Sequence, residues 1–216
     1  MTLMPREFFA RLSVPVAPDL LGCVLEHHTE AGLVAVELTE VEAYAGASDP
    51  ASHAYRGKTA RNAVMFGPPG HAYVYFTYGM HFCVNLVCLG NGSASAVLLR
   101  AGRIIEGEEL ARSRRTRGTT KIPFRDLARG PARLCQALDI DRSLDGADVC
   151  VPKSPLRMRW PDASTTARSV DRKVLSGPRV GISAAAEVPW RFWVEGDPTV
   201  SAYRPAVPRH RKLVTP

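Results

Sequence analysis

Two carboxylates, Glu40 and Glu42, stand in an unusual place in the sequence. The segment 33–43 alternates apolar and other residues, which predicts a strand, and continuing the alternation puts both carboxylates on its apolar face. An ionised carboxylate is costly to bury without a partner. Each glutamate must therefore lie near a rim, be displaced by a bulge, or be retained for chemistry such as accepting a proton.

A second unusual feature is the aromatic segment 71–88, which reads as two strands joined by a tight turn near Gly79. Tyr73 and Tyr75 share one face of the first strand, because side chains alternate along a strand. Tyr78 stands beside the turn, where a large aromatic ring is poorly placed to join a core. This hairpin tip needs an explanation other than packing.

The remaining pattern predicts the elements that position these residues. Strands are expected at 94–101, 179–183 and 190–194, and helices at 6–12 and 131–138. Arg100 is in phase with the apolar residues of its strand, segment 20–25 fits either a helix or a strand, and 112–133 and 151–172 read as loops. Because strands outnumber helices and lie close in sequence, we expect an α/β fold in one domain, 1–216, on a curved, mostly antiparallel sheet with flanking helices and a protruding hairpin.

Charge is concentrated in one segment of the chain. The 216 residues include 28 Lys and Arg against 21 Asp and Glu, a net charge of +7. Segment 112–133 holds eight basic residues against the single Asp126, whereas the remaining charges cancel. Such a segment suits a polyanion such as nucleic acid, although a solvated charged loop explains the composition equally well.

Composition also excludes several classes of protein. The hydrophobic fraction of 45% and charged fraction of 23% exclude intrinsic disorder, and no apolar run is long enough to span a membrane. Five cysteines without a C-x-x-C pair argue against a disulfide framework, an iron–sulfur cluster or a zinc knuckle, and favour a reducing compartment. No secretory segment, metal site or cofactor is expected, and the address is cytoplasmic or nuclear.

Six short motifs occur in a fixed order along the chain. They are Thr39–Tyr44, Ser52–Tyr55, Arg61–Phe66, Tyr73–Asn85, Leu98–Ala101 and Gly130–Leu138. In order and spacing they resemble the alkyladenine (3-methyladenine) DNA glycosylases, and segments 179–183 and 190–194 resemble that family's C-terminal strands. The resemblance implies a cofactor-free enzyme that flips a damaged purine out of duplex DNA and hydrolyses its N-glycosidic bond, on a fold like the C-terminal domain of methionyl-tRNA formyltransferases.

The resemblance assigns roles to the candidate site residues. Glu42 matches the glutamate that activates water, and Arg100 matches an arginine near that water and the flipped nucleotide's phosphate. Tyr44 and His53 would stack on one side of the base and Tyr75 on the other. Glu40 is the rival to Glu42 but lacks the motif match.

Further matches concern specificity and DNA contact. Asn85 would crowd the position of guanine's exocyclic amine and so exclude that base, and Tyr78 would be the wedge that fills the gap in the stack. Met65 matches a packing or groove contact beside the hairpin. The candidates for phosphate contact are the basic residues Arg114, Arg115, Arg117 and Arg133.

The implied enzyme is a monomer that binds double-stranded DNA and begins base excision repair on 3-methyladenine, 7-methylguanine, hypoxanthine and ethenoadenine. Its address is the nucleoid in a bacterium or the nucleus in a eukaryote. No lysine lies beside Glu42, so strand cleavage through a Schiff base is not expected. Two alternatives stay open. A non-catalytic nucleic-acid binding module related to the formyltransferase domain has no need of Glu42, Tyr44 and His53 together, and a hydrolase of free nucleosides has no use for Tyr78.

Overall fold

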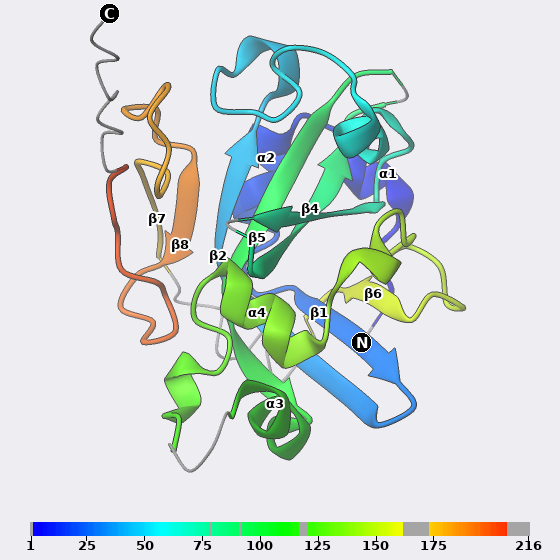
Figure 1. Ribbon diagram of the computed structural model, residues 1–216, viewed down its shortest axis with the longest axis vertical. Helices are drawn as coiled ribbons and strands as arrows, with labels where there is room; N and C mark the ends of the chain where they lie inside the picture. The colour runs from blue at the N-terminus through cyan, green and yellow to red at the C-terminus, as the bar shows by residue number, and fades with distance from the viewer. Residues whose placement is uncertain (1, 78, 91, 117–120, 162–172, 207–216) are drawn as a thin grey trace, which may run out of the picture.

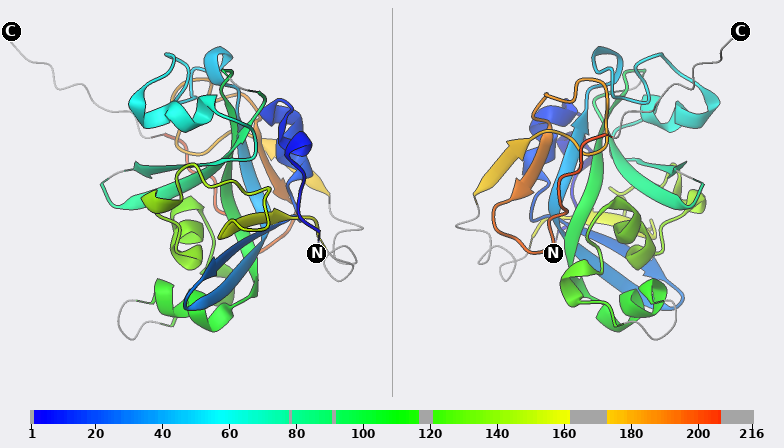
Figure 2. Two further views of the ribbon diagram at one scale, coloured as in Figure 1. Left: turned by 90° about the vertical axis from the view of Figure 1, so that its right-hand side faces the viewer. Right: turned by 60° about the vertical axis from the view of Figure 1, so that its left-hand side comes forward.

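The computed structural model describes residues 2–77, 79–90, 92–116, 121–161 and 173–206 (Figure 1). Within them, antiparallel strands form one sheet in the order β3-β4-β5-β2-β1-β6, with β8 paired to β2 and β7 to β8. The strands are β1 (Val24–Thr29), β2 (Gly32–Tyr44), β3 (Ala72–Thr77), β4 (His81–Cys88), β5 (Ser95–Glu106), β6 (Leu156–Arg159), β7 (Val174–Gly177) and β8 (Arg191–Val194). The sheet curls strongly, as the two views of Figure 2 show, and the predicted fold class is confirmed.

Short helices pack around this sheet. They are α1 (Arg6–Phe9), α2 (Ser13–Asp19), α3 (Glu108–Arg115) and α4 (Pro131–Leu138). In Figure 1, α1 and α2 lie toward the upper end of the sheet and α3 and α4 toward its lower end. Pro131 is the first residue of α4, where its missing N–H has no intrahelical partner to lose, and the helix therefore begins where the sequence predicts.

The two faces of the sheet differ in composition. Val74 in β3, Val84 in β4 and Leu99 in β5 are fully buried in the main core. Their chain neighbours Tyr75 and Asn85 point to the opposite face, where they line a pocket. One alternating pattern thus supplies both a hydrophobic core and a wall of polar and aromatic side chains.

Strands β2 and β5 change phase in the middle. Between the pairs Leu38–Gly102 and Glu40–Ala101, β2 carries one extra residue, and between Glu40–Ala101 and Val41–Leu99 β5 carries one, Arg100. Each insertion is a β-bulge, which turns all later side chains of its strand to the other face. Val41 therefore takes up the core face after Leu38, and Glu40 leaves it.

The bulge in β2 also marks the point where this strand changes its pairing partner. The first half of β2 pairs with β1 as far as Glu37, and the second half pairs with β8 at Glu40–Glu42. Gly102 allows β5 to approach closely here, because a Cβ atom at this position would lie 2.3 Å from Val36 and 2.4 Å from the carbonyl oxygen of Glu37.

Several sequence predictions of secondary structure are wrong. Residues 179–183 form no strand but a loop after β7, and the strands β6 and β7 and the helix α2 were not anticipated. Part of the basic segment forms α3. The apolar alternation of β6 covers only four residues, and the prolines of α2 hide its periodicity. In contrast, the turn near Gly79 is confirmed, because that residue has φ of +68° between β3 and β4.

Other features bear on chemistry. All five cysteines are free. Among the described residues, no group of three or more His, Cys, Asp or Glu side chains is arranged to hold a metal ion. None of the helices in this part of the chain has the length and apolar character needed to cross a membrane.

Candidate active site

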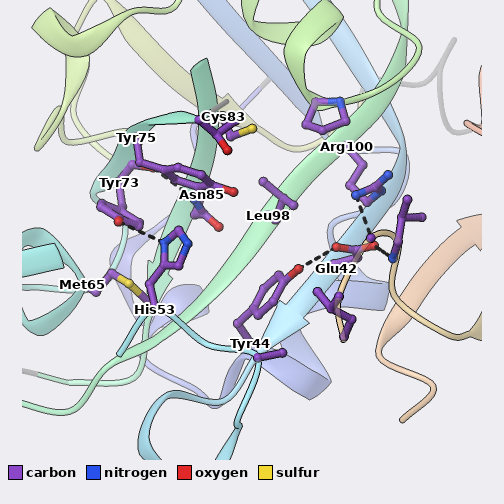
Figure 3. Close-up of a pocket in the computed structure, with 16 residues that line it drawn as sticks. Glu42, Tyr44, His53, Met65, Tyr73, Tyr75, Cys83, Asn85, Leu98 and Arg100 are labelled. Carbon is purple, nitrogen blue, oxygen red and sulfur yellow. Dashed lines mark hydrogen bonds and ion pairs between the residues drawn. The ribbon is translucent and has the colours of Figure 1, made fainter. Parts of the chain in front are cut away.

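A pocket of about 400 Å³ opens on the face of the sheet opposite the main core (Figure 3). β2, β3, β4 and β5 form its floor, and loops close its sides. It brings together seven residues that the sequence singled out: Glu42, Tyr44, His53, Met65, Tyr75, Asn85 and Arg100. These positions span 59 residues of chain, so it is the fold that brings them into one pocket.

Glu42 is fully buried at one wall of this pocket. Its Oε1 accepts a hydrogen bond from the backbone N–H of Val180 at 2.7 Å and lies 3.2 Å from Nη1 of Arg100. Its Oε2 accepts a hydrogen bond from the Tyr44 hydroxyl at 2.8 Å. An ionised carboxylate can accept about four hydrogen bonds, so these contacts fix Glu42 and leave it acceptor capacity for a further group.

Glu40 has different surroundings, although it lies two residues earlier in β2. It is fully buried and is absent from the pocket lining. Its carboxylate accepts hydrogen bonds from Nε of Arg100 at 2.7 Å, from Nε of Arg191 at 2.8 Å, and from the backbone and hydroxyl of Ser201. Burial opposes ionisation of Glu40, but the charges of Arg100 and Arg191 and these hydrogen bonds prevail and lower its pKa. Glu40 is an anchor for Arg100, and no acceptor site on it faces the pocket.

Arg100 joins the two glutamates. Its Nε donates to Glu40, its Nη1 lies against Glu42, and its Nη2 donates to the Ser201 hydroxyl at 3.4 Å. Burial alone would lower the pKa of Arg100, yet the two carboxylates raise it. The arginine therefore stays charged beside Glu42, on the wall of the pocket.

The aromatic residues of the pocket do not take up the expected arrangement. The rings of His53 and Tyr75 are in edge-to-face contact, with centroids 4.6 Å apart and planes inclined by 79°. A planar base cannot pass between them, so the expectation of Tyr44 and His53 on one side and Tyr75 on the other is wrong. Tyr73 stacks on Tyr75 at 5.5 Å, and its hydroxyl lies 3.1 Å from Nδ1 of His53. Figure 3 shows this group facing Tyr44 across the pocket.

Burial tunes the ionisable aromatic groups. It lowers the pKa of His53, with help from the charge of Arg61. It raises the pKa values of Tyr44 and Tyr75 well above that of free tyrosine, and in Tyr44 the nearby Glu42 adds to the effect. Near neutral pH the pocket therefore presents a neutral imidazole and neutral phenols.

Comparison with known proteins identifies the family of this chain. Residues 7–198 match the model of the family described as "Methylpurine-DNA glycosylase (MPG)". The chain belongs to this family. A relative from Streptomyces avermitilis, named "Putative 3-methyladenine DNA glycosylase", is 58% identical over 98% of this chain and 96% of its own. Relatives with the same printed name from Leifsonia xyli (50% identical, 92% of each chain) and Corynebacterium glutamicum (45% identical, 93% of this chain and 97% of its own) agree.

The chain is accordingly a DNA glycosylase of the 3-methyladenine type, a hydrolase of N-glycosyl bonds in DNA repair. The recognition made from its motifs is confirmed, and a non-catalytic binding module is not favoured. The roles of individual residues stay predictions.

Two other predicted site residues of the glycosylase lie within the pocket wall. Asn85 is nearly buried, and its Nδ2 donates to the carbonyl oxygen of Tyr73 at 3.2 Å. Met65 is also buried, in a small second cluster with Ala54, Tyr73, Val87 and Ala96. Its position favours the packing role over the groove contact.

The predicted DNA contacts of the glycosylase differ in accessibility. Tyr78 and Arg117 lie outside the described residues. Arg114 donates to the carbonyl oxygen of Ala137 and to Thr29, and Arg115 donates to the carbonyl oxygen of Leu127 and to Gln136. Arg133 is half exposed, in the helix whose first residue, Pro131, lines the pocket. Among the three arginines of this set that the structure describes, Arg133 is the most exposed and lies nearest in sequence to the pocket lining.

Sequence reasoning missed part of the pocket. Tyr73, Cys83 and Leu98 share strand faces with predicted residues, so their alternation was an available signal. Segment 180–182 also lines the pocket. The sequence predicts a strand there, whereas the structure has a loop, so alternation could not indicate which of its side chains face the pocket.

Proposed function

We propose that the glycosylase receives a flipped alkylated or deaminated purine in this pocket and hydrolyses its N-glycosidic bond with a water molecule that Glu42 activates. The observation that carries the proposal is the position of Glu42. Its carboxylate is buried, oriented by Val180 and Tyr44 and paired with Arg100, on the wall of a cavity that also presents the rings of His53, Tyr73 and Tyr75.

Hydrolysis at the sugar C1′ passes through an oxocarbenium-like state. The bond from C1′ to the base nitrogen breaks and its electron pair leaves with the base. A water oxygen then bonds to C1′, and its proton passes to Glu42. Arg100 pairs with the Glu42 carboxylate at 3.2 Å and so helps to fix its orientation toward the water.

The aromatic rings supply stacking surfaces for the flipped base. Because His53 and Tyr75 touch each other, the base fits between Tyr44 on one side and this pair on the other. Asn85 lies at the sheet floor between these walls and crowds the exocyclic amine of guanine, a penalty that excludes the uncharged base and that 7-methylguanine overcomes because its positive charge weakens the glycosidic bond. The pocket thus selects by shape as well as by stacking.

The charge of the leaving base then sets an order among substrates. An alkylated purine such as 3-methyladenine or 7-methylguanine is cationic and leaves as a neutral base without a proton. Hypoxanthine and ethenoadenine are neutral and need one. His53 has a lowered pKa and the tyrosines have raised ones, so these groups are poor proton donors at neutral pH. We expect the cationic purines to be released faster.

DNA contact is assigned to the hairpin tip and to basic residues near the pocket. Phe76 and Met80 are exposed on either side of the turn that carries Tyr78 in the sequence. Apolar side chains at such a tip can enter the minor groove and replace the stacking of an extruded nucleotide. The enzyme acts in this proposal as a monomer on double-stranded DNA.

The test is single-turnover base release from duplexes that carry one defined lesion. Glu42→Gln should still bind the duplex but lose release by about 100-fold or more, because the amide cannot accept the proton of water. Glu26→Gln is the matched control, since Glu26 also pairs with an arginine, Arg159, but lies outside the pocket. Release by Glu42→Gln at the parent rate would overturn the mechanism, and no release by the parent protein would overturn the function.

A further inference from the structure

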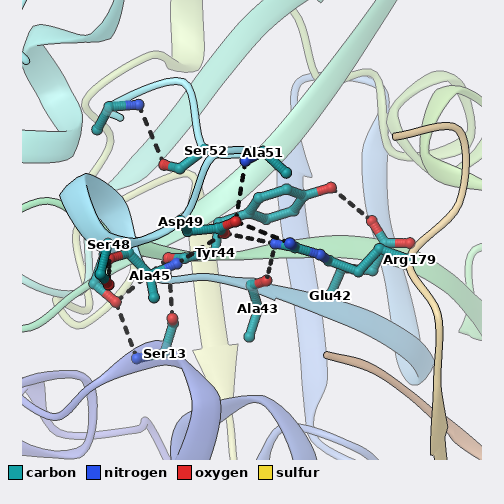
Figure 4. A network of polar contacts seen from close by, with 12 residues as sticks. Ser13, Glu42, Ala43, Tyr44, Ala45, Ser48, Asp49, Ala51, Ser52 and Arg179 are labelled. Carbon is teal, nitrogen blue, oxygen red and sulfur yellow. Dashed lines mark hydrogen bonds and ion pairs between the residues drawn. The ribbon is translucent and has the colours of Figure 1, made fainter. Parts of the chain in front are cut away.

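Behind the pocket lies a fully buried ion pair between Arg179 and Asp49 (Figure 4). Nη1 and Nη2 of Arg179 donate to the two carboxylate oxygens of Asp49 at 2.6 and 2.9 Å. The same carboxylate accepts hydrogen bonds from the backbone N–H groups of Ala45 and Ala51. Neither charged residue lines the pocket, so any effect on chemistry passes through other residues.

The guanidinium of Arg179 is held between two rings. Its Cζ lies 4.7 Å from the ring centroid of Tyr44 and 5.2 Å from that of Trp190. A guanidinium stacks on aromatic faces through cation–π attraction. Tyr44, which lines the pocket, therefore has a rigid cation packed against its ring.

The same side chain also ties down the neighbouring backbone. Nη1 of Arg179 donates to the carbonyl oxygen of Ala43 at 3.0 Å, and the next residue, Val180, donates its N–H to Glu42 at 2.7 Å. Three successive residues of β2, from Glu42 to Tyr44, are thus in contact with two successive residues of the loop after β7. Within the described residues this stretch of loop belongs to no strand, so these contacts hold its register.

We propose that the Arg179–Asp49 pair is a positioning element for the reaction, which holds the Tyr44 ring and the Glu42 carboxylate in their working orientations. A buried ion pair is weak evidence for stability, because apolar residues of similar size often replace one without loss. A planar guanidinium that donates through both Nη atoms to one carboxylate instead fixes the orientation of the groups around it. This orientation matters here, because in the proposed reaction Tyr44 faces the base and Glu42 faces the attacking water.

This inference rests on the proposed function. It predicts that changes to Arg179 and Asp49 slow the reaction, although neither residue contacts the substrate. Displacing a reacting group by about 1 Å can slow a reaction about 100-fold. Arg179→Lys keeps the charge but loses the fork, so single-turnover release should fall by about tenfold to 100-fold. The fluorescence change of ethenoadenine on entry into the pocket should also change, because it reports stacking on Tyr44.

The experiment uses the full chain in excess over a duplex with one ethenoadenine, so that an unfolded fraction does not alter the measured rate. A double variant, Arg179→Met with Asp49→Asn, removes both charges and should show the same two defects. The control is Arg103→Lys, which alters an ion pair with Asp197 of 2.6 Å outside the pocket and should leave both readouts within about twofold of the parent.

Parent-like release and fluorescence in either Arg179 variant would overturn the inference. Equal losses in the Arg103→Lys control would also overturn it, because the effect would then not be specific to the pocket. Glu42→Gln separates the two proposals. If Glu42→Gln loses release while Arg179→Lys retains it, only the positioning role fails, and if Glu42→Gln retains release, the proposed mechanism fails first.

Discussion

The Nε atom of Arg100 lies 2.7 Å from a carboxylate oxygen of Glu40, and its Nη1 lies 3.2 Å from Glu42. One arginine thus bridges two glutamates that the sequence places on the same strand face. The surroundings of these two glutamates differ. Glu40 is saturated by Arg100, Arg191 and Ser201, whereas Glu42 opens on the pocket. The two carboxylates therefore have different consequences when removed.

Glu40→Gln should destabilise the protein rather than act on the chemical step alone. Loss of one member of a buried, hydrogen-bonded pair costs about 3–5 kcal/mol, because the remaining charges lose their partner. Glu42→Gln should cost less, since Arg100 then keeps Glu40. Urea unfolding of both variants at pH 7 measures the difference, and equal losses would contradict the assignment of Glu40 as the anchor.

The same pair predicts a pH dependence. The pKa of Glu40 is lower in the folded protein than its ordinary value of 4.5, so its ionised form stabilises the fold. That contribution is complete above about pH 4.5 and is lost as pH falls through the lower folded-state value. The gap in unfolding free energy between the parent and Glu40→Gln should therefore shrink in acid.

The strand that carries these glutamates shows how far sequence reasoning reaches. Alternation correctly predicted β2 and raised the problem of Glu40 and Glu42 on an apolar face. The bulges that solve it leave no local signal, because they depend on how β2 and β5 pair. Gly102 is a partial exception, since a glycine inside a strand pattern often marks a close approach.

The pocket residues follow the same rule. Those on strands, such as Tyr75 and Asn85, were predictable from motif and alternation together. The contact between His53 and Tyr75 was not, because it joins a loop to a strand 22 residues later. Arg179 and Asp49 were missed altogether, since a buried pair between distant loops has no spacing that a sequence reveals.

The lowered pKa of His53 predicts a change of substrate preference with pH. His53 is neutral near pH 7 and gains a charge as pH falls through a value below 6.5. The imidazolium then repels a cationic purine but not a neutral one. The ratio of 7-methylguanine to ethenoadenine release should fall in acid, and His53→Phe should remove that fall while keeping a ring. An unchanged ratio in the parent would contradict a neutral His53 beside the base.

In the proposed complex, Tyr44 is the only pocket ring among the described residues on its side of the base, because the His53 and Tyr75 pair lies opposite. Loss of base–aromatic stacking costs about 1–3 kcal/mol, or about 5-fold to 150-fold in affinity. Tyr44→Leu should therefore weaken capture of flipped ethenoadenine more than Tyr75→Leu, because His53 and Tyr73 remain on the other side. Ethenoadenine fluorescence titrations compare the two, and the reverse order would show that the base lies elsewhere.

Exposed basic residues, rather than those that donate hydrogen bonds within the protein, should set the salt dependence of DNA binding. Lys121, Arg125 and Arg133 are exposed, whereas Arg114 and Arg115 donate to protein acceptors. Each lost phosphate contact reduces the slope of log affinity against log salt by about 0.9 on duplex DNA. Replacing the first three with Gln should reduce the slope, and replacing Arg114 and Arg115 should mainly lower the unfolding temperature. A reduced slope only in the second variant would return the phosphate contacts to the bonded pair.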